Sequence, residues 1–274
     1  MKKTVSLILA LAMVFALCAC GSSAASKDSS ELILGTSADY APFEFMYPDE
    51  SGEMVYGGID VFAADYIAQS MGKTLKVENM SFDYLLASLQ KGDYDIVMAA
   101  MEATDERKAS ADFSDPYYTD YPAMLLVKAD KADSFNTLSD FDGLSVAAQT
   151  ATTKEQIVTE SMPGASLVSL QNVNDIINQL VNDKIDAAVL DGSVALSYAA
   201  ANPDLAVASA SDELGAAEPY CVAVQKGDPK GLLPGINAAI AQMTAENKIE
   251  EFKDKSDELS GVAVEVTADA PAAG

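Results

Sequence analysis

The residue best suited to bind a small charged molecule is Arg107, in a chain that is poor in basic residues. It lies in the stretch AAMEATDERKASADFSDPYY (99–118), directly after YDIVMA (94–99), an apolar run typical of a buried strand. Open α/β sheets bind ligands at the carboxyl ends of their strands, and a guanidinium group is a planar donor suited to a carboxylate. We therefore predict that Arg107 forms the anion-binding half of a site. The local alternative is a surface ion pair with one of the acidic residues around it.

Two similar segments within the sequence supply a candidate for the other half of the site. LLASLQKGDYDIVMAA (85–100) aligns without gaps to IINQLVNDKIDAAVLD (176–191), and each segment reads as a helix, a polar turn and a buried strand. The first strand ends beside Glu102 and Arg107, and the second ends at Asp191. Two similar lobes that face each other would present a cation and an anion from matching strand ends. The similarity of the two segments has generic βαβ patterning as its alternative explanation, and Asp191 has a helix N-cap as its alternative role.

Together these charges suit a zwitterion. Arg107 would hold a carboxylate, and Asp191, which only accepts hydrogen bonds when ionised, would hold an ammonium. Tyr40, in the loop SADYAPFEF (37–45), offers an aromatic wall beside them. The pattern therefore favours an α-amino acid clamped between two lobes, while the neighbouring aromatic residues have plain core packing as their alternative.

The overall charge argues against several classes of function. The sequence has 17 Lys and Arg against 42 Asp and Glu, a net charge of −25, so it lacks the clustered cations that bind nucleic acid or an anionic lipid surface. It has no histidine, the usual general base and zinc ligand. We expect no metal, no cofactor and no nucleic acid partner. The hydrophobic content of 49% over 274 residues allows one large domain or two modest ones.

The first 19 residues are typical of a signal peptide. Lys2 and Lys3 precede the apolar run VSLILALAMVFAL, which is shorter than the about 20 residues of a transmembrane helix. The LCAC that follows resembles the bacterial lipoprotein box, which predicts cleavage before Cys20, lipidation of that residue and a flexible tether to residue 30. The alternative is an ordinary secretory signal. Lipidation would anchor the chain to the outer face of the cytoplasmic membrane and leave Cys221 as the remaining thiol, so we expect no disulfide.

The order of the remaining elements predicts parallel sheets with crossover helices. Strands are expected at 31–36, 74–79, 94–99, 144–149, 165–170 and 185–190, with helices between them. Asp60 is a candidate cap for a helix that ends near Gly72, and residues 46–58 read as a hairpin. The helical segment 231–255 is expected to break at Pro234-Gly235, and residues 263–274 are expected to be disordered.

Several segments together make the sequence resemble a known family. DYAPFEF, GGIDVFAADYI, FDYLLASLQKGDYDIVMAAMEATDERKASADFSDPYY and DKIDAAVLD look like the polar-amino-acid-binding proteins of ABC importers, the family 3 solute-binding proteins, over about residues 31–255. The resemblance implies a periplasmic-binding-protein type II fold, in which two Rossmann-like α/β lobes with mixed, mostly parallel sheets are joined by a two-strand hinge and close on the ligand. Lobe 1 would comprise 31–121 and 217–262 and lobe 2 122–216, with crossings near Tyr121–Val127 and Pro219–Val224.

The resemblance also assigns roles by position. It implies that Arg107 binds the carboxylate of the ligand, that Asp191 binds its ammonium, and that Tyr40 covers one side. The other positions assigned in this way are Ala100 (a backbone carbonyl for the ammonium), Thr152 and Thr153 (a turn that meets the carboxylate), and Gln149 and Leu190 (side-chain specificity).

The sequence departs from the family pattern in ways that bear on the ligand. The four departures are Glu102 for a Ser or Thr beside the carboxylate, Ala151 for a Gly in the turn, Ile59 for an aromatic wall, and Ser37 for an acidic residue seen in binders of basic side chains. A second anion at Glu102 would repel a carboxylate unless its side chain turns away. Ser37 weighs against basic ligands, and the overall acidity weighs against anionic ones. Polar-neutral or modestly apolar amino acids are favoured, and Glu102 leaves open a ligand other than a standard α-amino acid.

The sequence thus predicts an extracellular, monomeric binding lipoprotein that passes a small amino acid to an ABC permease and its ATPase. One alternative is a cleft enzyme of the cyclohexadienyl dehydratase type, for which Glu102 is the candidate acid or base. The other alternative is a sensor that presents its ligand to a signalling partner, and the lack of a recognisable signalling domain after the binding segment disfavours it.

Overall fold

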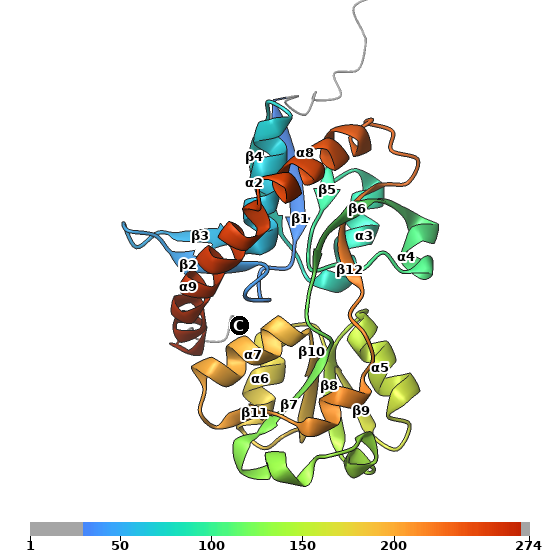
Figure 1. Cartoon of the computed structure of the whole chain (residues 1–274), viewed down its shortest axis with the longest axis vertical. Helices are drawn as coiled ribbons and strands as arrows, with labels where there is room; N and C mark the ends of the chain where they lie inside the picture. Colours follow the sequence, from blue (N-terminus) through green and yellow to red (C-terminus); the bar gives the residue numbers. More distant parts are fainter. Residues whose placement is uncertain (1–29, 270–274) are drawn as a thin grey trace, which may run out of the picture.

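The chain folds into two α/β lobes, each built on a five-stranded sheet. The computed structural model describes residues 30–269. The strand order is β4-β1-β5-β12-β6 in the first sheet and β11-β7-β10-β8-β9 in the second. Figure 1 shows the two lobes one above the other, linked by two crossing segments. The predicted signal peptide and Cys20 lie outside the described residues.

The first lobe carries a mixed sheet and a projecting hairpin. Strand β1 pairs in parallel with β4 and β5, whereas β12 runs antiparallel to β5 and β6. Its strands are β1 (Glu31–Thr36), β4 (Thr74–Asn79), β5 (Ile96–Val97), β6 (Ala111–Thr119) and β12 (Pro219–Gln225), and the hairpin is β2 (Phe45–Pro48) and β3 (Met54–Gly57). Its helices are α2 (Ile59–Ser70), η1 (Phe82–Tyr84), α3 (Leu85–Lys91), α4 (Asp105–Ser110) and α8 (Leu233–Ala245).

The second lobe repeats the plan of the first. Strand β8 pairs in parallel with β9 and β10, and β7 runs antiparallel to β10 and β11. Its strands are β7 (Met124–Lys128), β8 (Ser145–Gln149), β9 (Ser166–Leu170), β10 (Ala187–Leu190) and β11 (Leu205–Val207). Its helices are η2 (Ala129–Ser134), η3 (Leu138–Phe141), α5 (Thr153–Ser161), α6 (Val173–Val181), α7 (Gly192–Ala201) and η4 (Ser209–Glu213).

The chain crosses between the lobes at residues 120–123 and 214–218. The first crossing separates β6 from β7, and the second separates η4 from β12. The first crossing overlaps the start of the expected one at 121–127 but is shorter, because β7 belongs wholly to the second sheet. The second ends just before the expected one at 219–224, because β12 belongs wholly to the first sheet.

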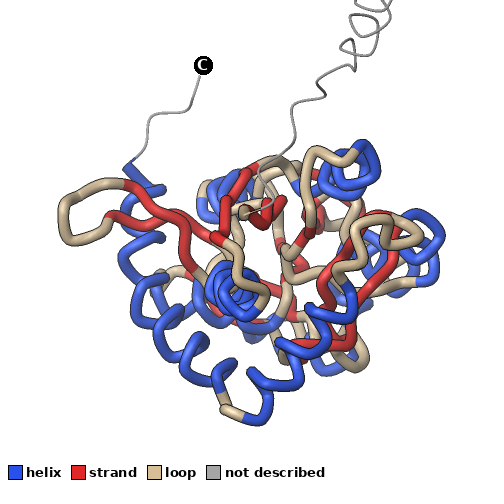
Figure 2. Tube along the Cα trace, turned by 90° about the horizontal axis from the view of Figure 1, so that it is seen from above, coloured by secondary structure: helices blue, strands red, loops and turns tan. Residues whose placement is uncertain are grey.

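The C-terminal helices differ from the sequence expectation. The predicted break at Pro234-Gly235 is wrong, because Pro234 lies in the first turn of α8, where its missing N–H and fixed φ are tolerated. The break falls at Asn247, which has a φ of 55°, and α9 (Lys248–Asp269) then runs into the segment predicted to be disordered. Helix α9 packs against β2, α2 and α7, so it contacts both lobes. Figure 2 shows this long helix beside the projecting hairpin. Within residues 30–269, no helix is long and apolar enough to cross a membrane.

The parallel strands of each lobe deliver the candidate residues to one edge of its sheet. Ser37 follows β1 and Ala100 follows β5, and these strands are parallel neighbours. In the second lobe Gln149 ends β8 and Asp191 follows β10, which are also parallel neighbours. Strands β1, β5, β8 and β10 are mostly buried, as their apolar runs predict, whereas the outer strands β4 and β9 are partly exposed. The candidate residues lie at or just past the carboxyl ends of the buried strands.

Candidate functional site

Arg107 is a buried, fixed cation at the edge of lobe 1. The hydroxyl of Thr104 caps the short helix α4 by accepting from the Arg107 amide at 3.2 Å. The guanidinium Nη1 donates to the carbonyl oxygen of Glu102 at 3.0 Å and to its Oε2 at 2.8 Å, and Nη2 donates to the carbonyl oxygen of Ala151 in lobe 2 at 3.2 Å. Its carbon Cζ lies 5.2 Å from the centre of the Phe82 ring. A surface ion pair is therefore the wrong description of Arg107.

Asp191 is the corresponding anion of lobe 2. It occupies the N-cap position of α7, but its side chain makes no capping hydrogen bond, so the cap alternative is wrong for the carboxylate. Instead, Oδ2 accepts from the Tyr40 hydroxyl of lobe 1 at 2.7 Å, and the Asp191 amide donates to the same hydroxyl at 3.1 Å. The other oxygen, Oδ1, lies 2.5 Å from Nζ of Lys154. Tyr40 and Asp191 thus join the two lobes directly.

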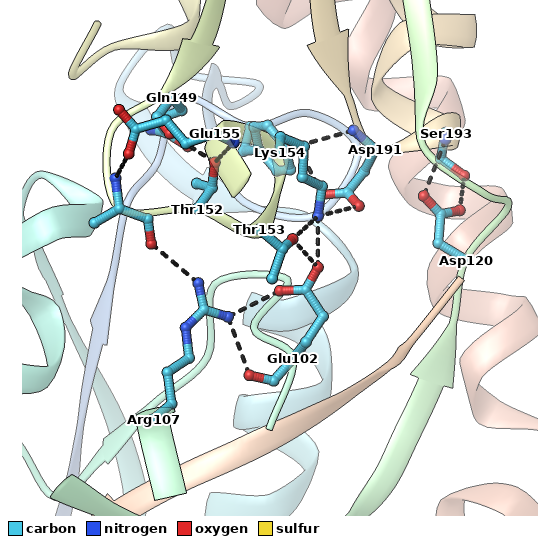
Figure 3. Close-up of polar contacts among 12 residues, drawn as sticks. Glu102, Arg107, Asp120, Gln149, Thr152, Thr153, Lys154, Glu155, Asp191 and Ser193 are labelled. Carbon is cyan, nitrogen blue, oxygen red and sulfur yellow. Dashed lines mark hydrogen bonds and ion pairs between the residues drawn. The ribbon is translucent and has the colours of Figure 1, made fainter. Parts of the chain in front are cut away.

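Glu102 and Lys154 lie between these two charges. Oε2 of Glu102 accepts from Arg107, and Oε1 accepts from the Thr153 hydroxyl at 2.8 Å and from Lys154 Nζ at 2.5 Å (Figure 3). The side chain of Glu102 therefore points into the space between the lobes. Arg107, Glu102, Lys154 and Asp191 are between 5% and 8% exposed, so this is a buried network of two cations and two anions that spans both lobes.

The network shifts the pKa values of three of its members, Glu102, Lys154 and Asp191. Burial alone would raise the pKa of Glu102, but the charges of Lys154 and Arg107 lower it to about 2. Burial alone would lower the pKa of Lys154, but Asp191 and Glu102 raise it. Burial, together with the charge of Glu102, raises the pKa of Asp191, while Lys154 and Tyr40 oppose that rise. The ammonium of Lys154 therefore lies between the carboxyl groups of Glu102 and Asp191, and the lowered pKa of Glu102 keeps that group ionised at neutral pH.

A second set of buried acids lies on lobe 1 behind Tyr40. Asp60 accepts from the Ala100 amide and from the Tyr117 hydroxyl, both at 2.7 Å, so the prediction that it caps α2 is wrong. Burial raises the pKa of Asp60 to about 7 and that of Glu44 well above its usual value. Oε2 of Glu44 is buried without a hydrogen-bond partner among the described residues. Lobe 1 therefore holds buried carboxyl groups whose raised pKa values favour the protonated form.

Asp39 forms a further interlobe contact. Its Oδ2 accepts from the Val173 amide of α6 at 2.8 Å, and its Oδ1 accepts from the Ser37 hydroxyl at 3.0 Å. Burial raises the pKa of Asp39 to about 6. A carboxyl group thus lies beside Ser37, although Ser37 itself is neutral.

The other predicted residues fall into two groups. Thr152 caps α5 and donates to the carbonyl oxygen of Gln149 at 2.6 Å, while the Gln149 amide donates to the Gln171 carbonyl at 3.0 Å. The Thr152 side chain thus stabilises its own turn, and the Gln149 side chain ties that turn to the loop after β9. The apolar group packs in the buried core around Tyr40 and consists of Ile59, Ala100 and Leu190. Ala100 also has a φ of 45°, a left-handed conformation that the hydrogen bond to Asp60 helps to hold.

Hollows flank the charged network on different sides. One of about 480 Å³ is lined by residues that include Phe82, Arg107 and Ala151. Another of about 230 Å³ is lined by residues that include Lys154, Asp191 and Tyr220. Within the described residues, no group of three or more histidine, cysteine or acidic side chains is placed to hold a metal ion.

Sequence reasoning missed Lys154, and one signal was available. A lysine in the first turn of a helix opposes the helix dipole, so such a position calls for anionic partners from elsewhere. Those partners, Glu102 and Asp191, come from both lobes. The fold and the site together define a two-lobed binding protein whose charged cleft lies at the facing strand ends.

The chain belongs to the family described as bacterial extracellular solute-binding proteins, family 3, whose pattern matches residues 32–258. It is 32% identical over 259 residues to the arginine-binding extracellular protein ArtP of Bacillus subtilis, covering 93% of this chain and 98% of the relative. It is 29% identical to the glutamine-binding protein GlnH of the same species, with 93% and 97% covered. A solved amino acid ABC transporter substrate-binding protein of Streptococcus pneumoniae, bound to L-arginine, is 36% identical with a TM-score of 0.78, covering 84% of this chain and 95% of that one.

These findings confirm the predicted class and fold. The chain is an extracellular amino-acid-binding component of an ABC importer with a two-lobed, type II periplasmic-binding-protein fold. It is a transport protein and not an enzyme, so the dehydratase alternative is set aside.

Proposed function

We propose that the cleft holds one free α-amino acid, with its carboxylate on Arg107, its ammonium on Asp191 and Tyr40 against one side. The observation that carries this proposal is the placement of two buried opposite charges at matching strand ends of the two lobes, with a carboxylate and an ammonium already fitting between them. Each charge-assisted hydrogen bond contributes roughly 1.5–3 kcal/mol, so two of them plus side-chain burial support micromolar affinity, about −8 kcal/mol.

The remaining predicted residues complete this proposed site. The carbonyl of Ala100 would accept from the ammonium, the turn of Thr152 and Thr153 would meet the carboxylate, and Ile59 would form an aliphatic wall opposite Tyr40. Gln149, Leu190 and Ser37 would face the ligand side chain. The Thr153 hydroxyl supports this assignment, because it already donates to a carboxylate that Arg107 also holds.

The side chain of the ligand has two candidate classes. Ser37 favours polar-neutral or modestly apolar amino acids. It is neutral, whereas the family resemblance implies an acidic residue at this position in proteins that bind basic side chains. Arginine is the second candidate, favoured by Asp39 beside Ser37 and by the arginine-binding relatives in Bacillus subtilis and Streptococcus pneumoniae.

A thermal-shift screen decides between these classes. The mature protein would be unfolded and refolded to remove carried-over ligand, then melted with each amino acid in turn. Stabilisation by glutamine or other neutral amino acids supports the first class, and stabilisation by arginine supports the second. The absence of any shift across the whole panel would contradict the proposed function.

We further propose that the protein works as a monomer that delivers its ligand to a permease and ATPase while anchored through lipidated Cys20. The LCAC segment and the Gly/Ser/Ala tether after it support the anchor. Mass spectrometry of the N-terminal peptide from the native host tests it. An acylated Cys20 is expected, and an unmodified one would contradict the anchor.

A further inference from the structure

Lys154 and Glu102 make the contacts that the proposed ligand would make. The carboxylate of Glu102 accepts from Arg107 and from Thr153, which are the proposed partners of the ligand carboxylate. The ammonium of Lys154 pairs with Asp191, which is the proposed partner of the ligand ammonium. Figure 3 shows the two side chains meeting midway between Arg107 and Asp191. The chain thus places a carboxylate and an ammonium of its own on both charged ends of the cleft.

The pair also holds the lobes together. Glu102 follows the sheet of lobe 1, whereas Lys154 lies in the first turn of α5 in lobe 2, and their charged atoms are 2.5 Å apart. Both residues are nearly fully buried, with 6% of Glu102 and 5% of Lys154 exposed. A zwitterion that took the Nη1 of Arg107 and the Oδ1 of Asp191 would displace these partners, because those two atoms are already paired with Glu102 and Lys154.

We propose that Glu102 and Lys154 form an internal competitor for the amino-acid site and thereby determine its specificity. A ligand binds by displacing the pair from Arg107 and Asp191. This inference rests on the proposed function for the identity of the ligand, but the contact between the lobes stands without it. The competition is intramolecular, so the pair acts at a high effective concentration.

The competition has a consequence for the class of ligand. Glycine offers only an α-carboxylate and an α-ammonium, the same two groups that the pair already supplies, so it gains little by displacing them. A ligand with a longer side chain adds contacts that the pair does not make. Those contacts supply the free energy that displaces Glu102 and Lys154 from Arg107 and Asp191. The pair therefore rejects the smallest amino acids and admits those whose side chains are bound in the cleft.

The test uses Glu102→Ser and Lys154→Gln, singly and together, beside a matched control. The control is Lys76→Gln with Glu78→Ser, an exposed ion pair on β4 whose removal changes the same charges outside the buried network. Ligand affinity is measured by calorimetry with glycine and with the best amino acid from the thermal-shift screen. Small-angle X-ray scattering of the refolded, ligand-free proteins reports how far the lobes separate. Circular dichroism checks folding, and Glu102→Gln with Lys154→Met replaces any variant that fails to fold.

The expected results separate this inference from the proposed function. The double variant should bind its amino acid at least tenfold more tightly, should acquire measurable glycine binding, and should show a larger radius of gyration without ligand, while the control matches the wild type. Unchanged scattering with unchanged or weaker binding would overturn the inference and leave the proposed function intact. Enlarged scattering with no amino acid bound by any variant would support the interlobe contact and contradict the proposed function.

Discussion

At the scale of single residues, the Glu102 carboxylate contacts charged or polar side chains of both lobes. One carboxylate oxygen accepts from Arg107 of its own lobe, and the other accepts from Thr153 and Lys154 of the opposite lobe. Its pKa is lowered to about 2 despite its burial, because Lys154 and Arg107 stabilise the charged form. Glu102 is therefore ionised at neutral pH, and its contacts across the cleft are charge-assisted.

The hydroxyl of Tyr40 provides a prediction at this scale. Tyr40→Phe removes the donor to Asp191 and the acceptor of the Asp191 amide while keeping the ring. A hydrogen bond to a charged group contributes roughly 1.5–3 kcal/mol, so ligand affinity should fall by about tenfold or more. Calorimetry measures the change. Tyr84→Phe is the matched control, since Tyr84 is 54% exposed, and equal affinity in both variants would show that the Tyr40 hydroxyl does not act in closure.

The positions of Arg107 and Asp191 could be predicted from the sequence, whereas the role of Lys154 and the orientation of Glu102 could not. Arg107 and Asp191 were predictable because each follows a buried strand, which hydrophobic periodicity reveals. Lys154 had only one weak signal, its place in the first turn of a helix, because its ion-pair partner Glu102 is 52 residues away and no local spacing rule connects them. The orientation of Glu102 was open for the same reason: whether a carboxylate turns toward the cleft depends on the cations that the other lobe brings to it.

At the scale of elements, a glycine before α2 allows the loop that carries Tyr40 to pack. Gly58 has a φ of 116°, and a Cβ there would overlap the carbonyl group of Phe43. The same approach lets the amides of Ile59 and Asp60 donate to the carbonyls of Pro42 and Phe43. The start of α2 and the loop 37–45 are thus held by backbone contacts that no side chain can replace.

We expect Gly58→Ala to destabilise lobe 1 and weaken ligand binding. The new Cβ must displace backbone as well as adopt a left-handed φ, so the loss should exceed the roughly 1–3 kcal/mol of conformational strain alone. Thermal unfolding measures it. Gly52→Ala is the control, since Gly52 also has a positive φ of 84° but a Cβ there would have no other atom within 4 Å. A Gly58 variant no less stable than the Gly52 variant would contradict this account.

The boundaries of elements show where local patterns end and tertiary contacts take over. Strands β1, β4 and β8 lie where their apolar runs predict them. The helical role of Asp60 was misjudged, because a carboxylate in the first turn usually caps or complements the helix dipole. Here Tyr117 and Ala100, both distant in sequence, bring donors that hold it in the core instead. Pro234 was misjudged because a proline that would break a helix interior also fits its first turn.

At the scale of the whole molecule, lobe 1 carries three buried or partly buried acids, and one of them contacts lobe 2. Asp39 contacts the start of α6 across the cleft, and Asp60 and Glu44 lie buried in lobe 1. All three have raised pKa values because burial disfavours their charged forms. The protein also carries a net charge of −25. The folded, closed form is therefore most favourable where these buried acids keep their protons.

The pH dependence of stability follows from these shifts. A group whose pKa is raised on folding contributes stability below its unfolded value, and that contribution is lost as the pH rises through the folded value. The stability contribution of Asp39 is lost between about pH 4 and pH 6, and that of Asp60 between about pH 4 and pH 7. Within its range each group lowers the free energy of unfolding by about 1.4 kcal/mol per pH unit. The melting temperature should therefore be higher at pH 5 than at pH 8.

Asp39→Asn separates this effect from the general repulsion of an acidic chain. The variant removes one titrating group, so its melting temperature should fall less between pH 5 and pH 8 than that of the wild type. Glu102, with its lowered pKa, loses its contribution only in the acid range below about 4.5 and does not affect this comparison. An equal or steeper fall in the variant would contradict the assignment to Asp39.

The central claim is that a single amino acid is held in the cleft through Arg107. The direct test is a calorimetric titration of the refolded protein and of Arg107→Ala with the amino acid that gives the largest thermal shift, using Lys108→Ala on the same helix as the control. The wild type and the control should bind one molecule per chain with micromolar or tighter affinity, and the folded Arg107 variant should show no measurable binding. Equal binding by the Arg107 variant would contradict the account.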